Sequence, residues 1–189
     1  QLDLSGSVSA DSFADLTKIV ENNQVAFGDQ YTWSSYNPTT HKVIYTQKAD
    51  KLTIMDGSSQ IIFTINANDQ VVSYEQTYAG SVQVLGKERE LISAQKAVEV
   101  LYLAGRISSK ATVQSVKLSY YQSLVLKDFS IYSPAWYIEI RQADGQLIAR
   151  RVDAIHGTVL ANETLETTNT QTQRTTTNNT TTTQSVQQQ

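Results

Sequence analysis

The residue types best suited to chemistry lie near the end of the part of the chain that contains apolar residues. Asp153 and His156 stand three positions apart in the stretch RRVDAIHGTVL. A carboxylate beside an imidazole is an arrangement that hydrolases use to activate a nucleophile. Such a pair needs a nucleophile or a metal presented to it, and the local sequence offers neither. We therefore interpret His156-Gly157 as a turn after a strand and assign no catalytic residue.

The remaining sequence carries no stronger sign of an enzyme. It lacks the HExxH, GxSxG, P-loop and dinucleotide-binding glycine motifs. With no cysteine and only His41 and His156, it has too few ligands for a usual zinc site unless the fold adds carboxylates. Glu88 and Glu90 are more simply a solvated loop before a helix, although sequence leaves open two carboxylates converging in a glycosidase cleft. We expect no enzyme, no cofactor and no metal.

Amino-acid composition indicates which classes of partner suit the chain and which part of it can fold. The chain has 189 residues, a net charge of −3 and a pI near 5.4, so nucleic acid is a poor candidate partner. From residue 164 to 189 the sequence is mostly Thr, Gln and Asn, which predicts a disordered tail after a folded region of residues 1–163. No apolar run approaches the roughly 18 residues of a membrane span. The start at Gln1 fits equally a membrane helix lying upstream and an arbitrary boundary.

Apolar spacing predicts two helices. Over residues 12–22, an apolar face recurs at the spacing of a helix, with Asp11 or Ser12 as its cap; it consists of Phe13, Leu16, Ile19 and Val20. A second helix is predicted over residues 94–104. Ser93 suits its N-cap, Ile92 can pack on Ala97 in a hydrophobic staple, and Gly105 is the expected stop.

The other segments predict strands joined by turns too short for parallel crossovers. Strand-like stretches start at KVIYTQ, KLTIM and QIIFTINA, continue in a long alternation over residues 71–85, and resume from residue 112 to 160. The predicted fold class is α+β, with antiparallel sheets each covered by a helix on one face. Residues 1–86 and 87–163 are candidate halves of a diverged structural repeat, although no sequence identity between them establishes it.

The last two strands predict a hairpin whose register follows from apolar matching. A two-residue Asp144-Gly145 loop would set Trp136 opposite Asp153. A three-residue loop, residues 143–145 with Gly145 in the left-handed conformation, sets Trp136 opposite Val152 and Ile140 opposite Ile148. We predict the three-residue loop, although it places Arg150 opposite Ile138 on the apolar face.

Motifs across the chain resemble the YycI family of two-component regulatory proteins. They are LTKIVENNQVAFG at 16–28, SYEQTY at 73–78, LISAQKAVEVLY at 91–102, VKLSYY at 116–121, and PAWYI with VDAIHGTV at 134–138 and 152–159. Each motif is weak alone, but their order and spacing are fairly specific. Asp153 stands where the family usually has Asn, and Ser119 where it has Gly. The family's N-terminal membrane helix and the Thr/Gln-rich tail do not match.

The resemblance implies a function without chemistry. YycI-like proteins are single-pass membrane proteins of Gram-positive bacteria whose bulk lies outside the membrane. With a YycH-like protein they act on the sensor histidine kinase YycG, also called WalK, which governs cell-wall metabolism. This chain would then be the extracytoplasmic domain, tethered by a membrane helix absent from the given sequence. Its fold would resemble YycH domains and PepSY modules. The alternative is a PepSY-like module that binds a peptide, a protease or a wall polymer.

Aromatic residues give two candidate contact patches. Ten tyrosines and two tryptophans against four phenylalanines suit amphipathic surfaces that face a partner. Adjacent tyrosines in a strand cannot both point into one core face. The first predicted patch is therefore Tyr120, Tyr121 and Tyr132. The second is Tyr31, Trp33 and Tyr36. For any single tyrosine, packing between strands is the simpler interpretation.

Overall fold

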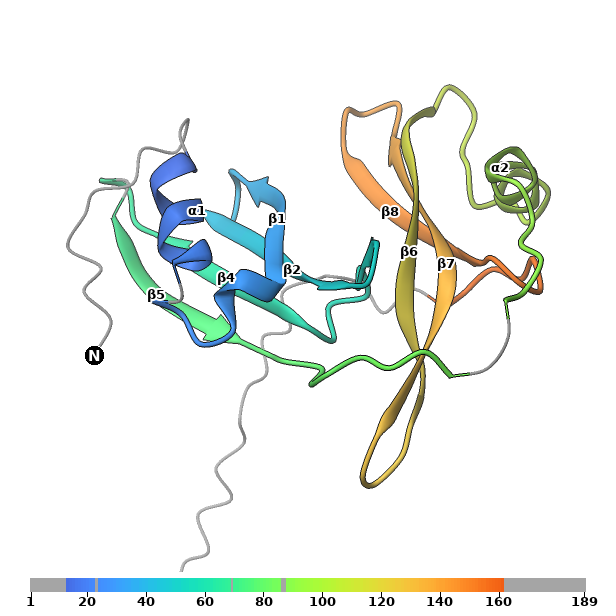
Figure 1. Ribbon diagram of the computed structural model, residues 1–189. Coiled ribbons are helices and arrows are strands. Elements are labelled where there is room, and N and C mark those ends of the chain that lie inside the picture. Colours follow the sequence, from blue (N-terminus) through green and yellow to red (C-terminus); the bar gives the residue numbers. More distant parts are fainter. Residues whose placement is uncertain (1–12, 23, 69, 86–87, 162–189) are drawn as a thin grey trace, which may run out of the picture.

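The computed structural model describes residues 13–22, 24–68, 70–85 and 88–161, and these form an α+β fold with two antiparallel sheets (Figure 1). The first half holds α1 (Ala14–Glu21), a short 3-10 helix η1 (Gly28–Gln30), β1 (Tyr31–Asn37), β2 (Lys42–Ala49), β3 (Leu52–Thr53), β4 (Gln60–Ile65) and β5 (Val71–Gln76). The second half holds α2 (Ala94–Leu103), β6 (Thr112–Val125), β7 (Ser130–Arg141) and β8 (Leu147–Asp153). The predicted fold class is confirmed.

The first sheet has the order β1-β2-β4-β5, with β3 paired to the far end of β2. Helix α1 lies on one face of this sheet, and Leu16 and Val20 are fully buried in a core that includes Tyr45 and Phe63. Burying side chains of this size contributes roughly 1.5–3 kcal/mol each. The predicted helical face is confirmed, although the helix begins at Ala14. The cap predicted at residue 11 or 12 lies outside the described residues.

The alternation over residues 71–85 does not make one long strand. Strand β5 ends at Gln76. The chain then leaves the sheet, and polar contacts with residues distant in the sequence fix its path. The Thr77 amide donates to Gln60 O at 2.9 Å, and the Ala79 amide donates to Gln47 Oε1 at 3.0 Å. Gly80 follows with a φ of +81°, which bends the chain.

The second sheet has the order β6-β7-β8 and is covered by α2 on one face. Ala97 and Leu101 are buried against Ile138, Ile140 and Val152. The Ser93 side chain accepts a hydrogen bond from Lys96 N at 3.1 Å, which confirms the predicted N-cap. The Trp136 indole donates to Ile92 O at 2.9 Å and fixes the start of α2 on the sheet.

The β7–β8 hairpin has the predicted register. Trp136 pairs with Val152, Ile140 with Ile148, and Arg150 lies opposite Ile138. Gln142 N donates to Gln146 O at 2.8 Å around a three-residue loop, in which Gly145 has a φ of +87°. Burial and then the nearby Arg106 lower the pKa of Arg150, as expected for a guanidinium at the margin of an apolar face.

The two sheets share no strand and meet where residues 54–58 lie along the outer edge of β6. Ile54 forms a parallel bridge with Tyr120, and Met55 N donates to Tyr120 O at 3.0 Å. Asp56 accepts from the Gln122 amide through Oδ2 and from the Ser58 amide, at 2.9 Å, through Oδ1. From β8, Arg151 donates to Met55 O at 3.1 Å. We call residues 54–58 with these partners the junction.

The disordered tail predicted at residues 164–189 lies outside the described residues. Among the helices of the described chain, none is long and apolar enough to cross a membrane.

Gly28 is required where η1 approaches α1. A Cβ at this position would lie 1.9 Å from Val20 O, so an added methyl group must displace the helix or the loop. We expect Gly28→Ala to lower the free energy of unfolding by about 2 kcal/mol, the typical cost of overpacking a core. Gly105→Ala is the control: its φ is +65° but no atom lies within 4 Å of its Cβ, so only conformational strain of about 1 kcal/mol applies. Urea unfolding measures both, and a Gly28→Ala protein as stable as wild type would contradict the close approach.

Candidate functional site

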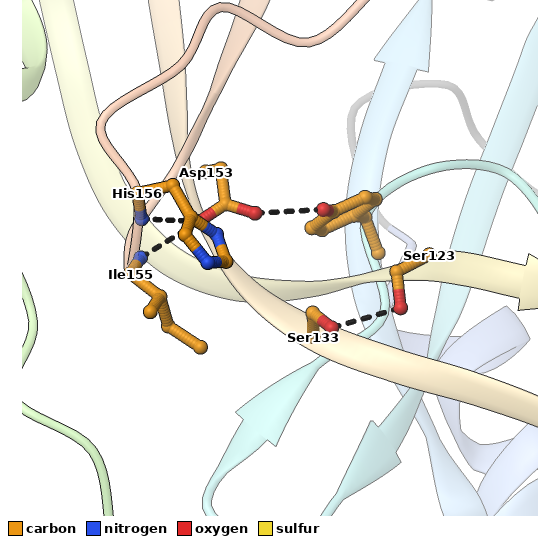
Figure 2. A network of polar contacts seen from close by, with 6 residues as sticks. Ser123, Ser133, Asp153, Ile155 and His156 are labelled. Carbon is orange, nitrogen blue, oxygen red and sulfur yellow. Dashed lines mark hydrogen bonds and ion pairs between the residues drawn. The ribbon is translucent and has the colours of Figure 1, made fainter.

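Asp153 organises the turn that follows β8. Its Oδ1 accepts hydrogen bonds from the amides of Ile155 at 2.8 Å and His156 at 2.7 Å, and lies 3.1 Å from His156 Nδ1 (Figure 2). Its Oδ2 accepts from the Tyr121 hydroxyl at 2.8 Å. The carboxylate therefore closes a turn and anchors β6 to it.

The electrostatics agree with a structural carboxylate. Burial alone would raise the pKa of Asp153, but the His156 amide, the Tyr121 hydroxyl, the Ile155 amide and the His156 ring together lower it. Burial and the same carboxylate raise the pKa of Tyr121 to about 12, so this phenol remains a donor at neutral pH.

In the part of the chain that the structure describes, the imidazole of the Asp153–His156 pair has no serine hydroxyl bonded to it. Ser123 and Ser133, which Figure 2 also draws, bond to each other, with Ser133 Oγ donating to Ser123 Oγ at 2.8 Å. Within the described ranges, no hydroxyl is hydrogen-bonded to the His156 ring and no group of three or more His, Cys, Asp or Glu could hold a metal. A hollow between the two sheets is lined by residues such as Thr46, Met55 and Tyr137, and its lining includes no carboxylate or histidine.

The first predicted patch lies at the junction. Tyr120, Tyr121 and Tyr132 are all half-buried. The Tyr120 carbonyl accepts a hydrogen bond from the Met55 amide, and the Tyr121 hydroxyl donates one to the Asp153 carboxylate. The Tyr132 hydroxyl lies 3.4 Å from Ser58 Oγ, across the junction. The register places the side chains of Tyr120 and Tyr132 on one face of the hairpin and that of Tyr121 on the other. The three tyrosines therefore lie near one another without forming a single patch, and their role in partner contact remains a prediction.

The second predicted patch is divided between core and surface. Tyr31 is 2% exposed and donates to Thr77 O at 2.6 Å, so its side chain belongs to the core. Trp33 is 48% exposed, and its ring stacks on Phe13 with centroids 6.3 Å apart. Tyr36 packs on the same Phe13 ring at 5.1 Å. The accessible part of this patch is therefore Trp33 and Tyr36 with Phe13.

A third surface was missed by the sequence interpretation. At the tip of the β6–β7 hairpin, Leu124, Val125, Leu126 and Phe129 are 43–66% exposed. The stretch LVLKDFSI carries the signal, because apolar residues flank a Lys127-Asp128 turn. The sequence alone did not show that these side chains are exposed, because it does not show how far β6 and β7 extend beyond the end of β8.

The lowered pKa of Asp153 predicts a dependence of stability on pH. A carboxyl whose folded pKa is depressed contributes stability that is complete above the unfolded pKa of about 3.9 and is lost as pH falls through the folded pKa. Asp153→Asn keeps an acceptor for the two turn amides but loses the charge. We expect it to cost about 1 kcal/mol at pH 7, the difference between charged and neutral hydrogen bonds. Its stability should also fall less than that of wild type between pH 4.5 and 2.5.

Urea unfolding across this pH range measures both effects. Equal losses of stability on acidification in the two proteins would contradict the assigned role of Asp153.

Comparison with known proteins identifies the family of the chain. No curated protein matches the sequence. The model of one family, described as YycI protein, matches residues 3–155. The match spans both sheets and the junction between them, and it ends at Ile155 within the Asp153 turn. The chain therefore belongs to the YycI family, whose members are regulators of the YycG/WalK two-component system.

Proposed function

We propose that the chain is the extracytoplasmic domain of a membrane-anchored protein that binds a YycH-like protein and, with it, modulates the YycG/WalK sensor histidine kinase. In this role the domain carries out no reaction, and its output is control of cell-wall metabolism through the kinase. Membership of the YycI family supports the regulatory role. The compartment, the membrane anchor and the YycH-like partner rest on the resemblance described above.

The observation that carries a binding role is the apolar surface at the tip of the β6–β7 hairpin. Phe129 is 57% exposed, and Leu124 and Leu126, on the same face of the hairpin, are 47% and 43% exposed. Clustered exposed apolar side chains of this kind mark interaction sites on soluble domains. Among the described residues, no group of three or more His, Cys, Asp or Glu side chains could hold a metal ion.

The second candidate is a module that binds an extracellular peptide, a protease or a wall polymer. The observation in its favour is that β7 extends past the end of β8 and leaves an unpaired sheet edge. An extended peptide can add to such an edge. The broad apolar surface beside the edge favours a folded partner instead, because it requires more cover than a single peptide backbone provides.

Light scattering after size-exclusion chromatography tests the proposal. We expect the chain mixed with the YycH-like ectodomain of the same organism, at tens of micromolar, to elute as a mixed species with the summed mass. An unrelated acidic protein of similar size serves as the control for non-specific association. Two separate peaks at these concentrations would contradict binding through the ectodomain and favour the second candidate.

A further inference from the structure

The β6–β7 hairpin projects beyond the rest of the second sheet as an arm, which we define as residues 122–133 (Figure 1). Strand β8 pairs with β7 only as far as Ala135 opposite Asp153. The chain then turns away, and Ala154 N makes a last hydrogen bond to Pro134 O at 3.0 Å. The arm therefore consists of two strands, with no β8 beside Ser130–Ser133.

The hydrogen-bond pattern shows which backbone groups of the arm face outward. Leu126 N donates to Phe129 O at 2.9 Å, so the backbone N–H and C=O of Phe129 point toward β6. Pro134 O accepts from Ala154, so Pro134 directs its carbonyl away from β6. The backbone N–H and C=O groups of successive residues in a strand point to opposite edges. Those of Ser130 and Tyr132 therefore point outward, away from β6. Among the described residues, these groups have no backbone partner on that side.

The two faces of the arm differ in chemistry. Leu124 lies opposite Ile131, and Leu126 lies opposite Phe129, so these four apolar side chains share one face. On the other face, Gln122 Nε2 donates to Ser130 Oγ at 2.9 Å and lies 3.5 Å from the Tyr132 hydroxyl. The exposed fractions of Leu124, Leu126 and Phe129 are 47%, 43% and 57%. The arm thus presents an apolar face next to an open edge.

We propose that an extended strand of the YycH-like partner adds to the outer edge of β7 at Ser130–Ser133, where its apolar side chains pack beside those of Phe129 and Ile131 on this face, while the rest of the partner covers Leu124 and Leu126. The inference rests on the proposed function and deepens it by naming the surface. The open edge selects an extended backbone, because only a strand pairs with both Ser130 and Tyr132. The apolar face selects a strand with apolar residues at alternate positions.

A lipid surface fits the arm less well. Insertion into an anionic bilayer calls for apolar residues around the end of a loop and for basic residues beside them. Here the apolar side chains lie on one face, the end is Lys127-Asp128, and Lys127 is the one basic residue in the arm.

A second copy of the chain also fits less well. The apolar face of one arm has only three side chains that are about half exposed, so two arms paired together would cover less than the ~1,200 Å² of stable interfaces. A different partner can extend its contact beyond the arm.

The apolar face is tested by the affinity of the full 189-residue chain for the YycH-like ectodomain, measured by calorimetry. We expect the double variant Leu126→Ser/Phe129→Ser to bind at least ten-fold more weakly. The matched control is Tyr102→Ser/Leu103→Ser on α2, where the replaced side chains are 68% and 71% exposed. This control should bind within two-fold of wild type.

The open edge is tested at Ser130. Ser130→Pro removes an N–H that points outward, so no hydrogen bond between β6 and β7 is lost. Strand β7 already accepts proline at Pro134, whose backbone also faces outward. Ser130→Ala keeps the N–H and loses the same contact to Gln122, so it is the matched control. We expect the proline variant to bind at least ten-fold more weakly and the alanine variant to bind like wild type. Circular dichroism establishes that each variant is folded.

The outcomes separate the inference from the function on which it rests. If wild type binds and the arm variants bind equally well, the arm is not the contact surface, while the proposed function stands. If wild type does not bind the ectodomain, the proposed function fails. Self-association of the chain, or binding to phosphatidylglycerol vesicles, that disappears in Leu126→Ser/Phe129→Ser would assign the arm to a second copy or to lipid and overturn the inference.

Discussion

The arrangement of the whole molecule depends on the junction between residues 54–58 and the edge of β6. Each sheet has its own helix and its own core, and the backbone bridge from Ile54 to Tyr120 holds them in one orientation. Asp56 bonds to Ser58 with one oxygen and to the Gln122 amide with the other, so one carboxylate fixes both sides of the contact. Hydrogen bonds to a charged group are among the stronger polar contacts in proteins, which suits a connection made by few residues.

The junction also explains why β6 and β7 can extend so far. The β3–β4 segment supports β6 near Tyr120, and β8 supports β7 up to Ala135. Beyond these supports the hairpin continues as two strands, with an extra residue in β6 between Gln122 and Leu124. Two-stranded ribbons are marginally stable alone, so an arm rooted in two sheets is better placed to present an apolar face than an isolated hairpin. Tyrosines at its root bond to Asp153 and lie beside Ser58, which ties the arm to both halves.

Local patterns predicted much of the fold, and long-range contacts decided the rest. The register of β7 and β8 followed from matching Trp136 and Ile140 to apolar partners, because a slip by one residue would invert every side chain. By contrast, the end of β5 depends on Gln47, which binds the Ala79 amide from 32 residues away. The burial of Tyr31 depends on Thr77 in the same way. The apolar residues of the arm were visible in the sequence but not as an arm, because the sequence did not show that β8, with seven residues, ends short of the twelve-residue β7.

Amide hydrogen exchange of the chain, followed by NMR with and without the YycH-like ectodomain, tests the central claim most directly. The amides of Ser130 and Tyr132 point outward and should exchange fast in the free chain, whereas the Ile131 amide, which points toward β6, should exchange more slowly. Binding of a partner strand is expected to protect Ser130 and Tyr132 and to leave α2 unchanged. Protection confined to α2 or to Trp33, with no change at Ser130 and Tyr132, would contradict the account.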